Sequence, residues 1–323
     1  MTNYYYIIKA LIVIAISYLL YVQLTDVNTV HHIHTVMETT KDSKYLLFLW
    51  LCIALMPINW WLESKKWQIL MSPYVIITRW QSFKSVLAGV AAGIVTPARL
   101  GEYAGRLVLN DPDLKSQVIS ATLLGSLAQN LCNIIVGAGF SYYFLKSLIG
   151  VTYLNGLTFL IIVSFQVILM IYIYYNLPKV ASILKKFFKL SYIDKWQSQI
   201  QSLDQYSIRL LHKVLAISAI RYLVYFMQYI LILKFLGVEL ETKIYFQNIG
   251  SIYLIQTLIP LPAFVSVLAR GELAILVWTS AGVDKVTALT ATFGLWMINL
   301  IVPAILGLII IYSTNFKKYF SKK

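Results

Sequence analysis

The chain has 323 residues, of which 59% are hydrophobic and 12% are charged, and its formal net charge is +14. So apolar a composition excludes the soluble globular classes, and it makes nucleic-acid binding a poor explanation for the positive charge. Several apolar runs of about 20 residues match the hydrocarbon core of a bilayer, which is about 30 Å thick. The composition therefore predicts an all-α polytopic membrane protein.

Six stretches are long and apolar enough to be full transmembrane helices. In chain order they cover residues 6–24, 45–62, 117–145, 154–176, 214–236 and 287–313. The first of them has the length of a signal peptide but lacks an A-x-A cleavage site. We therefore expect it to remain in the protein as the first span.

Lysine and arginine residues gather in three segments, 63–85, 177–213 and 314–323. The positive-inside rule predicts that all three are cytoplasmic, and such clusters also favour contact with anionic lipid headgroups. The segment 25–44 has no such bias and is expected outside. The prediction is an integral protein of the cell (cytoplasmic or inner) membrane with both termini in the cytoplasm.

Two basic stretches also resemble interfacial amphipathic helices. Lys65–Lys84 mixes Lys and Arg with tryptophan and apolar residues, and Ile183–Leu190 has a similar character. Helices of this kind lie in the plane of the membrane surface with the apolar face toward the lipid.

Counting the crossings leaves two segments that start and finish on the same side. The stretch 86–109 lies between two cytoplasmic ends, and 244–281 lies between two external ends, so each is predicted to be a re-entrant helical hairpin. Pro260 and Pro262 fall near the middle of the second, where proline would interrupt the helix at the tip. Each half then has two spans, a hairpin and a span, in opposite orientations. This is an inverted repeat of residues 1–146 and 147–323.

Each predicted hairpin carries an Arg and a Glu beyond its prolines. The first reads Thr96-Pro97-Ala98-Arg99-Leu100-Gly101-Glu102, with Arg106 four residues later, and the second continues to Ala269-Arg270-Gly271-Glu272. Ionised side chains at membrane depth are costly and are usually retained for function. The sequence therefore predicts a polar cavity near the midplane, where two hairpins from opposite sides meet.

The spacing of these charges differs between the two hairpins. Arg99, Glu102 and Arg106 share one face of a helix. Arg270 and Glu272 are two residues apart and would point in different directions unless Gly271 breaks the helix. An Arg can bind a phosphate bidentately, and a Glu can orient the Arg or carry a proton or an ammonium group. The alternative is that Arg99–Glu102 and Arg270–Glu272 are internal ion pairs that hold the hairpins together.

Polar side chains within the other spans complete the predicted cavity. Gln129 and Asn133 share a helix face, and Trp296 with Asn299 would form the opposite wall, although hydrogen bonding between helices explains them equally well. The glycines at 89, 93, 101 and 105 have the spacing that lets two helices pack closely. The predicted hinge and hairpin positions are Pro97, Gly101, Pro260, Pro262 and Gly271.

The first motif, Pro97-x-Arg99-x-Gly101-Glu102-x-x-x-Arg106, resembles the signature of the lysylphosphatidylglycerol synthase transmembrane-region family. The segment Leu258-Ile259-Pro260-Leu261-Pro262, followed by Gly271-Glu272, resembles the second motif of that family. The chain departs from it in having Ala263–Arg270 where the family is glycine-rich, and in lacking an Arg within Gly294–Asn299. The resemblance implies a flippase-like domain that moves lipids between leaflets. Without a soluble synthase domain, no aminoacyl transfer is expected.

Enzyme motifs are missing from the sequence. It has no G-x-S-x-G, HExxH or P-loop, so a transporter is favoured over an enzyme, with no cofactor and no metal. The group His31, His32 and His34 lacks further spaced ligands, and Cys52 with Cys132 are expected to be reduced thiols packed in apolar segments. The predicted partner is a phospholipid, an aminoacyl-phospholipid or a polyprenyl-phosphate carrier, and a homo-oligomer is left open. The alternatives are a membrane-embedded transferase, a transporter of a small soluble anion, and a scaffold.

Overall fold

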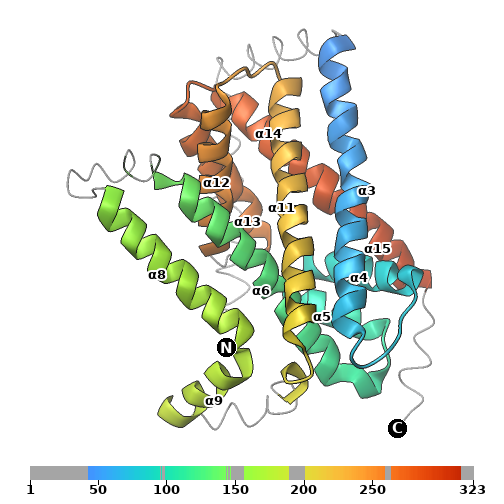
Figure 1. Ribbon diagram of the computed structural model, residues 1–323. Helices are drawn as coiled ribbons and strands as arrows, with labels where there is room; N and C mark the ends of the chain where they lie inside the picture. The colour runs from blue at the N-terminus through green and yellow to red at the C-terminus, as the bar shows by residue number, and fades with distance from the viewer. Residues whose placement is uncertain are drawn as a thin grey trace, which may run out of the picture.

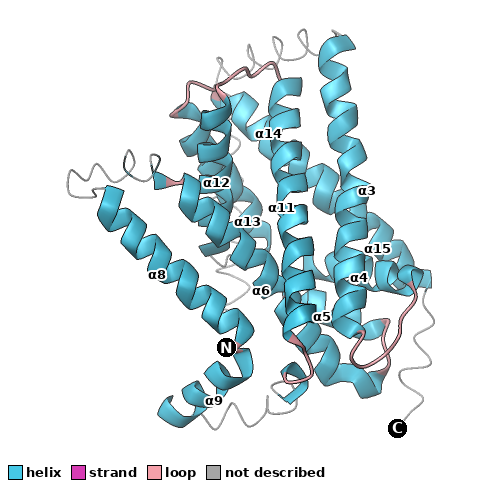
Figure 2. Ribbon diagram, viewed as in Figure 1, coloured by secondary structure: helices cyan, strands magenta, loops and turns pink. Residues whose placement is uncertain are grey.

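The structure is a computed structural model that describes residues 43–94, 96, 99–142, 144, 146, 156–188, 201–258 and 263–313. Every regular element in these ranges is helical (Figures 1 and 2). The helices are α3 (Ser43–Met71), α4 (Arg79–Ile94), α5 (Gly101–Val108), α6 (Lys115–Phe140), α8 (Gly156–Tyr175), α9 (Leu177–Phe188), α11 (Ile208–Phe235), α12 (Thr242–Leu258), α13 (Ala263–Thr279), α14 (Lys285–Trp296) and α15 (Val302–Ser313). A 3₁₀ turn at Pro112–Leu114 precedes α6, and a π-helical segment at Met297–Ile301, η4, joins α14 to α15.

Five segments within the described ranges are long and apolar enough to cross a membrane. They are Tyr45–Met71, Pro112–Phe140, Gly156–Tyr175, Ile208–Phe235 and Lys285–Ser313. They correspond to five of the six predicted spans. The predicted span 6–24 lies outside the described residues.

The helices α3 and α11 pack side by side (Figure 1). The side-chain amide of Gln228 on α11 donates to the carbonyl of Cys52 on α3 at 2.9 Å. The predicted span 45–62 is too short, because α3 continues to Met71. Its added turns bring Glu63 and Lys66 into the protein interior, where both are buried.

This extension also corrects the interpretation of Lys65–Lys84 as one amphipathic helix. The stretch contains the end of α3, a connection and the start of α4. Trp67, within it, is fully buried and packs in the protein interior. The second predicted amphipathic stretch, Ile183–Leu190, overlaps the end of α9. It is helical up to Phe188, and its last two residues lie outside the described ranges.

The helices α4 and α5 form a tightly packed pair, longer than the predicted hairpin 86–109 because α4 starts at Arg79. Glycine is required where their backbones meet. A Cβ atom at Gly101 would lie 2.0 Å from the carbonyl oxygen of Ala92, and one at Gly105 would lie 2.3 Å from that of Ala88. The predicted close packing of glycine-bearing arms is confirmed for this pair.

The helices α12 and α13 form a second pair, whose bounds agree with the predicted hairpin 244–281 to within two residues. Residues 259–262, which include both prolines of the predicted tip, lie outside the described ranges. In Figure 1 this pair lies toward the upper end of the bundle and the α4–α5 pair toward the lower end. The two pairs meet, because α13 contacts α4.

Each pair also packs against a span from the other part of the chain. The glycine at 307 in α15 lies against α4, where an added Cβ would be 2.0 Å from the carbonyl oxygen of Leu87. The glycine at 137 in α6 lies against α12, where an added Cβ would be 2.8 Å from the carbonyl oxygen of Gly250. These two close approaches tie the first and second halves of the chain together.

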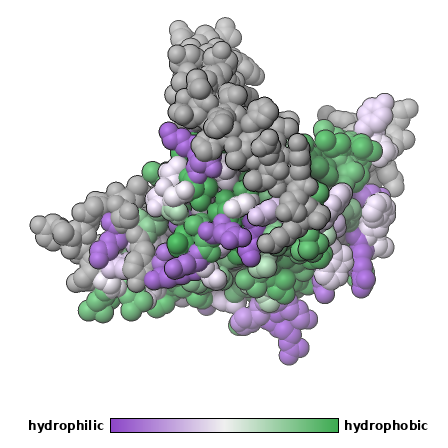
Figure 3. All heavy atoms as spheres, turned by 90° about the horizontal axis from the view of Figure 1, so that it is seen from above, coloured by the Kyte–Doolittle hydropathy of each residue, from purple (hydrophilic) through white to green (hydrophobic). Residues whose placement is uncertain are grey.

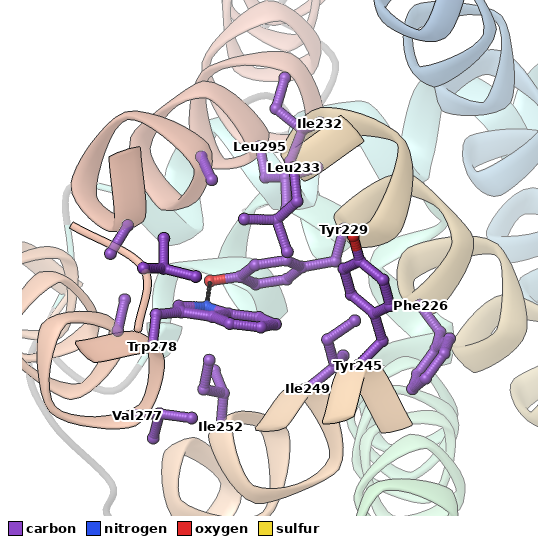
Figure 4. Close-up of a cluster of buried hydrophobic side chains, with 14 of the residues drawn as sticks. Phe226, Tyr229, Ile232, Leu233, Tyr245, Ile249, Ile252, Val277, Trp278 and Leu295 are labelled. Atoms are coloured by element: carbon purple, nitrogen blue, oxygen red, sulfur yellow. Dashed lines mark hydrogen bonds between the residues drawn. The ribbon is translucent and has the colours of Figure 1, made fainter. Parts of the chain in front are cut away.

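A buried aromatic cluster joins α11, α12, α13 and α14 (Figure 4). The indole Nε1 of Trp278 donates to the hydroxyl of Tyr229 at 3.1 Å, and that hydroxyl lies 2.7 Å from the hydroxyl of Thr292. The polar atoms of these large side chains therefore have partners, as buried tyrosine and tryptophan usually do.

The outer surface is strongly apolar. Over the membrane-spanning window of α8, no residue is buried in the protein, although its mean hydropathy is 2.4. Seen from above, hydrophobic residues cover much of the described rim, and hydrophilic residues gather in separate patches (Figure 3). In an aqueous protein such a surface would aggregate, whereas in a bilayer it faces acyl chains.

Candidate functional site

Glu63 on α3 is the centre of a buried charge network that we call the polar hub. Its carboxylate lies 2.7 Å from Lys66 Nζ and 3.0 Å from Arg106 Nη2, and it also forms an ion pair with Arg221. The side chain of Glu63 is 8% exposed and those of its three partners are 7% exposed or less. Glu63 therefore joins α3, α5 and α11 through one carboxylate.

Arg106 extends the hub into the α4–α5 pair. Its guanidinium lies 2.5 Å from Glu102 Oε1, and it also stacks over Trp67, with its central carbon 4.5 Å from the ring centroid. Charge-assisted hydrogen bonds and stacking of this kind suit arginine better than lysine. Arg106 thus forms ion pairs with Glu63 and Glu102 and a cation–π contact with Trp67.

Arg221 extends the hub in the other direction. Its Nε donates to Asn59 Oδ1 at 2.9 Å, and its Nη1 donates to Gln129 Oε1 at 3.3 Å. Asn59 in turn donates to Asn299 Oδ1 at 3.4 Å, which brings in the π-helical segment η4. Two of the residues predicted for the cavity walls, Gln129 and Asn299, therefore lie in one connected network.

Arg99 lies two residues before α5 in a left-handed backbone conformation, with φ of 57°. The prediction that it shares one helix face with Glu102 and Arg106 is therefore wrong. A non-glycine residue rarely adopts this conformation, and such positions often lie at functional sites. Its guanidinium lies 3.4 Å from Glu102 Oε2, and its side chain is 45% exposed. The hydroxyl of Thr96 accepts a hydrogen bond from the backbone N–H of Gly101 at 2.6 Å, which fixes the turn that carries Arg99.

Arg270 on α13 approaches this turn from the second helix pair. Its charge interacts with that of Arg99, and Tyr253 and Tyr225 are its other electrostatic neighbours. Among the described residues, no hydrogen bond or ion pair holds its guanidinium. The charges of two arginines thus interact between the helix pairs, and Arg270 has no ion-pair partner within the described ranges.

Glu272 lies on a different side of α13. The helix is unbroken through Gly271, so Arg270 is partly buried while Glu272 is exposed. No ion pair joins Arg270 to Glu272, and the expected second Arg–Glu pair is therefore not present in the described structure. The reason is geometric, because residues two apart on a continuous helix do not face each other.

The charges of this region do not balance. Lys66, Arg99, Arg106, Arg221 and Arg270 provide five cations, and Glu63 with Glu102 provide two carboxylates. Positive charges therefore exceed negative ones by three, and apart from the partly exposed Arg99 these groups are buried or partly buried, where an unpaired charge is expensive. Such an arrangement favours an anionic ligand.

Several buried donors in this region also have no acceptor. They are Trp60 Nε1, Trp67 Nε1, Trp296 Nε1, Arg106 Nε and Asn299 Nδ2. A buried N–H without an acceptor costs about 1–3 kcal/mol, and most buried donors in proteins are paired. Oxygen atoms of a ligand or of bound water would satisfy these groups.

The remaining predicted residues fall outside the network. Asn133 donates to the hydroxyl of Thr257 on α12 at 2.9 Å, so for this residue the interpretation as a hydrogen bond between helices is the one observed. Trp296 is partly buried at the border of η4. Gly271 packs inside α13 against Leu289, while Pro97, Pro260 and Pro262 lie outside the described ranges.

Four residues of the hub were missed: Asn59, Glu63, Lys66 and Arg221. The positive-inside rule predicts that Glu63 and Lys66 lie in the cytoplasmic segment 63–85, and not in the protein interior. Arg221 lies well inside a 28-residue apolar helix, and a charge in that position is a functional signal in its own right. That signal could have been found in the sequence, although its partner Glu63 could not.

Comparison with known proteins assigns the chain to a family. The profile described as lysylphosphatidylglycerol synthase TM region matches residues 6–307. The chain belongs to this family. The match confirms the resemblance of its motifs, and with the helical structure it makes the chain an integral membrane protein of a lipid-related family. No curated protein matches the chain.

No metal site emerges from the described ranges, which contain no group of three or more His, Cys, Asp or Glu suited to a metal ion. The predicted reduced thiols are confirmed, since Cys52 and Cys132 are both buried and free. The three histidines at 31, 32 and 34 lie outside the described residues.

Proposed function

We propose that this member of the lysylphosphatidylglycerol synthase TM-region family moves a lipid with an anionic or zwitterionic headgroup between leaflets. The observation that carries the proposal is Arg270, whose charge interacts with that of Arg99 and which has no ion pair among the described residues, near a hub with more cations than carboxylates. A phosphate group bound by these guanidiniums would supply negative charge that the described site lacks. Phospholipids, aminoacyl-phospholipids and polyprenyl-phosphate carriers all provide such a group.

The proposed architecture is an inverted repeat of residues 1–146 and 147–323 with two re-entrant hairpins, α4–α5 and α12–α13. The supporting observation is placement. The connection before α6 and the connection before α12 lie at opposite ends of the bundle, as opposite orientations of two halves require (Figure 1). The helix pair of each half also packs closely against the last span of the other half, α15 against α4 and α6 against α12, as two halves related by symmetry would.

Within this scheme the charged side chains have different roles. Arg99, Arg106 and Arg270 bind the headgroup, and Glu102 holds Arg99 and Arg106 until a phosphate replaces it. Glu63 fixes the hub from the α3 side by its ion pairs with Arg106 and Arg221. Glu272, on the exposed side of α13, would meet a cationic part of a headgroup or carry a coupling proton.

Alternating exposure of the site would move the lipid. The positions Pro97, Pro260 and Pro262 would serve as hinges. We place the protein in the cell membrane with both termini cytoplasmic, acting as a transporter without a cofactor. The lipid is its partner, and no enzymatic step is required.

The test uses the full-length protein in proteoliposomes with a fluorescently labelled phosphatidylglycerol, whose arrival in the opposite leaflet is measured by dithionite quenching. Arg270→Gln should reduce the rate at least tenfold, and Lys115→Gln, an exposed residue at the start of α6, should leave it unchanged. Transport by Arg270→Gln at the wild-type rate would overturn the proposal. Uptake of free phosphate without lipid movement would favour the soluble-anion alternative, and formation of a modified lipid would favour a transferase.

A further inference from the structure

A second feature lies away from the polar hub, between the end of α3 and the start of α11. It is a groove with a cavity volume of about 590 Å³. Three basic residues line it, Lys65 from α3 and Arg209 with Lys213 from α11, together with Ser207 and apolar residues such as Ile69 and Ile217. The volume is within the range of about 300–1,000 Å³ that is typical of small-ligand sites. We call it the α3–α11 groove.

The cations of the α3–α11 groove have no counter-charge. Lys65, Arg209 and Lys213 are all exposed, none of them takes part in a salt bridge within the described structure, and the lining contains no acidic residue. Arg209 and Lys213 are one helical turn apart, so they project from the same side of α11. Lys65 faces them from the neighbouring helix. The positive charges on both sides of the groove therefore favour binding of an anion.

The start of α11 adds to this attraction. Ser207 is the N-cap of the helix, and its hydroxyl accepts a hydrogen bond from the backbone N–H of Leu210 at 3.3 Å. The first backbone N–H groups of a helix and its dipole favour negative charge. A phosphate at this end of the groove would meet the helix start and both side chains of α11.

Most of the exposed lining of the groove is apolar, which favours an amphiphile over a free ion. It runs along α11 from Ser207 to Ile217, a length of about 15 Å at a rise of about 1.5 Å per residue. Exposed apolar side chains lie farther along the same two helices, including Trp61 and Ile220, each 49% exposed. These would continue the surface for acyl chains beyond the groove.

We propose that the α3–α11 groove binds an anionic phospholipid, with its phosphate between Lys65, Arg209 and Lys213 and its glycerol and upper acyl chains over Ile69 and Ile217. The site is separate from the polar hub, because Lys65 projects outward from α3 whereas Glu63 and Lys66 project inward. The proposal does not depend on transport. It requires only that this end of the bundle lies at a membrane surface.

The test measures lipid retention by the purified full-length protein. Native mass spectrometry after delipidation and addition of phosphatidylglycerol should show one lipid that the wild type retains at least tenfold more strongly than the Lys65→Gln, Arg209→Gln, Lys213→Gln triple variant. The control is Arg79→Gln, Lys84→Gln, Lys115→Gln, which removes three basic residues outside the groove and should retain the lipid. Arg270→Gln should retain it as well, which separates this result from a failure of the transport proposal.

A second pair of variants tests the groove without changing charge. Ala216 lines it, so Ala216→Trp should fill it and weaken retention, while Ala219→Trp at an exposed position outside the lining should not. Retention by the groove triple variant equal to the wild type would overturn the proposal. So would equal loss in both triple variants, equal retention of phosphatidylcholine, or competition by inorganic phosphate at a concentration equal to that of the lipid.

Discussion

The two helix pairs differ in how their charges are held. In α4–α5, Arg106 contacts two carboxylates and Arg99 contacts one, and Glu102 bridges them. In α12–α13, the charge of Arg270 interacts with Arg99, Tyr253 and Tyr225, and among the described residues it has no ion pair with a carboxylate. The arginines of the first pair are therefore held by Glu102 of the same pair and by Glu63 of α3, whereas Arg270 of the second pair has no ion pair in the part of the chain that the structure describes.

The two pairs also differ in how tightly their glycines are enclosed. An added Cβ at Gly101 or Gly105 would collide with the backbone of α4, which cannot move aside without separating the helices. At Gly271 it would meet the side-chain ends of Leu289 at 3.0 Å and Phe293 at 3.2 Å, which can rotate. The comparison indicates that α4–α5 is a rigid base and that α13 has room to adjust. Four substitutions test this difference, taken from the largest expected effect to the smallest.

Gly101→Val should be the most damaging, because its Cβ would lie 2.0 Å from the carbonyl oxygen of Ala92. The α4–α5 pair would separate, at a cost above the roughly 1–3 kcal/mol usual for overpacking. Little folded protein should remain by fluorescence-detected size-exclusion chromatography. Gly139→Ala is the matched control, since nothing lies within 4 Å of an added Cβ there. Normal folding of the valine variant would contradict the rigid base.

Glu63→Gln should come next, since it leaves Lys66 and Arg106 close together and Arg221 without its carboxylate. Breaking a buried ion pair by removing one partner costs about 3–5 kcal/mol. The measurement is the free energy of unfolding in detergent. Glu272→Gln, at an exposed position, should change stability by less than about 0.5 kcal/mol. Equal losses for the two variants would show that Glu63 is not the centre of the hub.

Tyr229→Phe tests the packing behind the second pair. It removes the acceptor for Trp278 Nε1 and the partner of Thr292, so a buried donor loses its hydrogen bond (Figure 4). The expected loss is about 1–3 kcal/mol in unfolding free energy. Tyr312→Phe, at a side chain that is 92% exposed, is the control and should have no effect. A loss below about 0.5 kcal/mol for Tyr229→Phe would mean that these hydrogen bonds contribute nothing net.

Arg270→Gln should have the smallest effect on stability. The substitution removes a cation that has no ion pair to lose and that lies near another cation, so the unfolding free energy should stay the same or rise slightly. Arg106→Gln, which removes a paired charge, should lower it by about 3–5 kcal/mol. Thermal unfolding of the two variants under identical conditions measures the difference. If Arg270→Gln is as damaging as Arg106→Gln, the contrast between the helix pairs is wrong.

Much of the fold followed from local features of the sequence. The apolar runs predicted five of the observed spans, and the predicted hairpin 244–281 agrees with the bounds of α12 and α13 to within two residues. Such elements can be predicted because length and hydropathy are properties of a continuous segment. The motif around Arg99 indicated the family, which the match over residues 6–307 confirms. Helical spacing also paired Glu102 with Arg106 correctly, whereas Arg99 lies outside the helix and reaches Glu102 from the turn before it.

Tertiary structure alone decided which charges belong to one site. Glu63 meets Arg106 across 43 residues of sequence and Arg221 across 158, and no periodicity links positions so far apart. The same contacts explain why α3 extends beyond its predicted end. Charged residues usually mark a loop, because burying them is expensive, and here two arginines from other helices compensate Glu63 and allow the helix to continue into the protein.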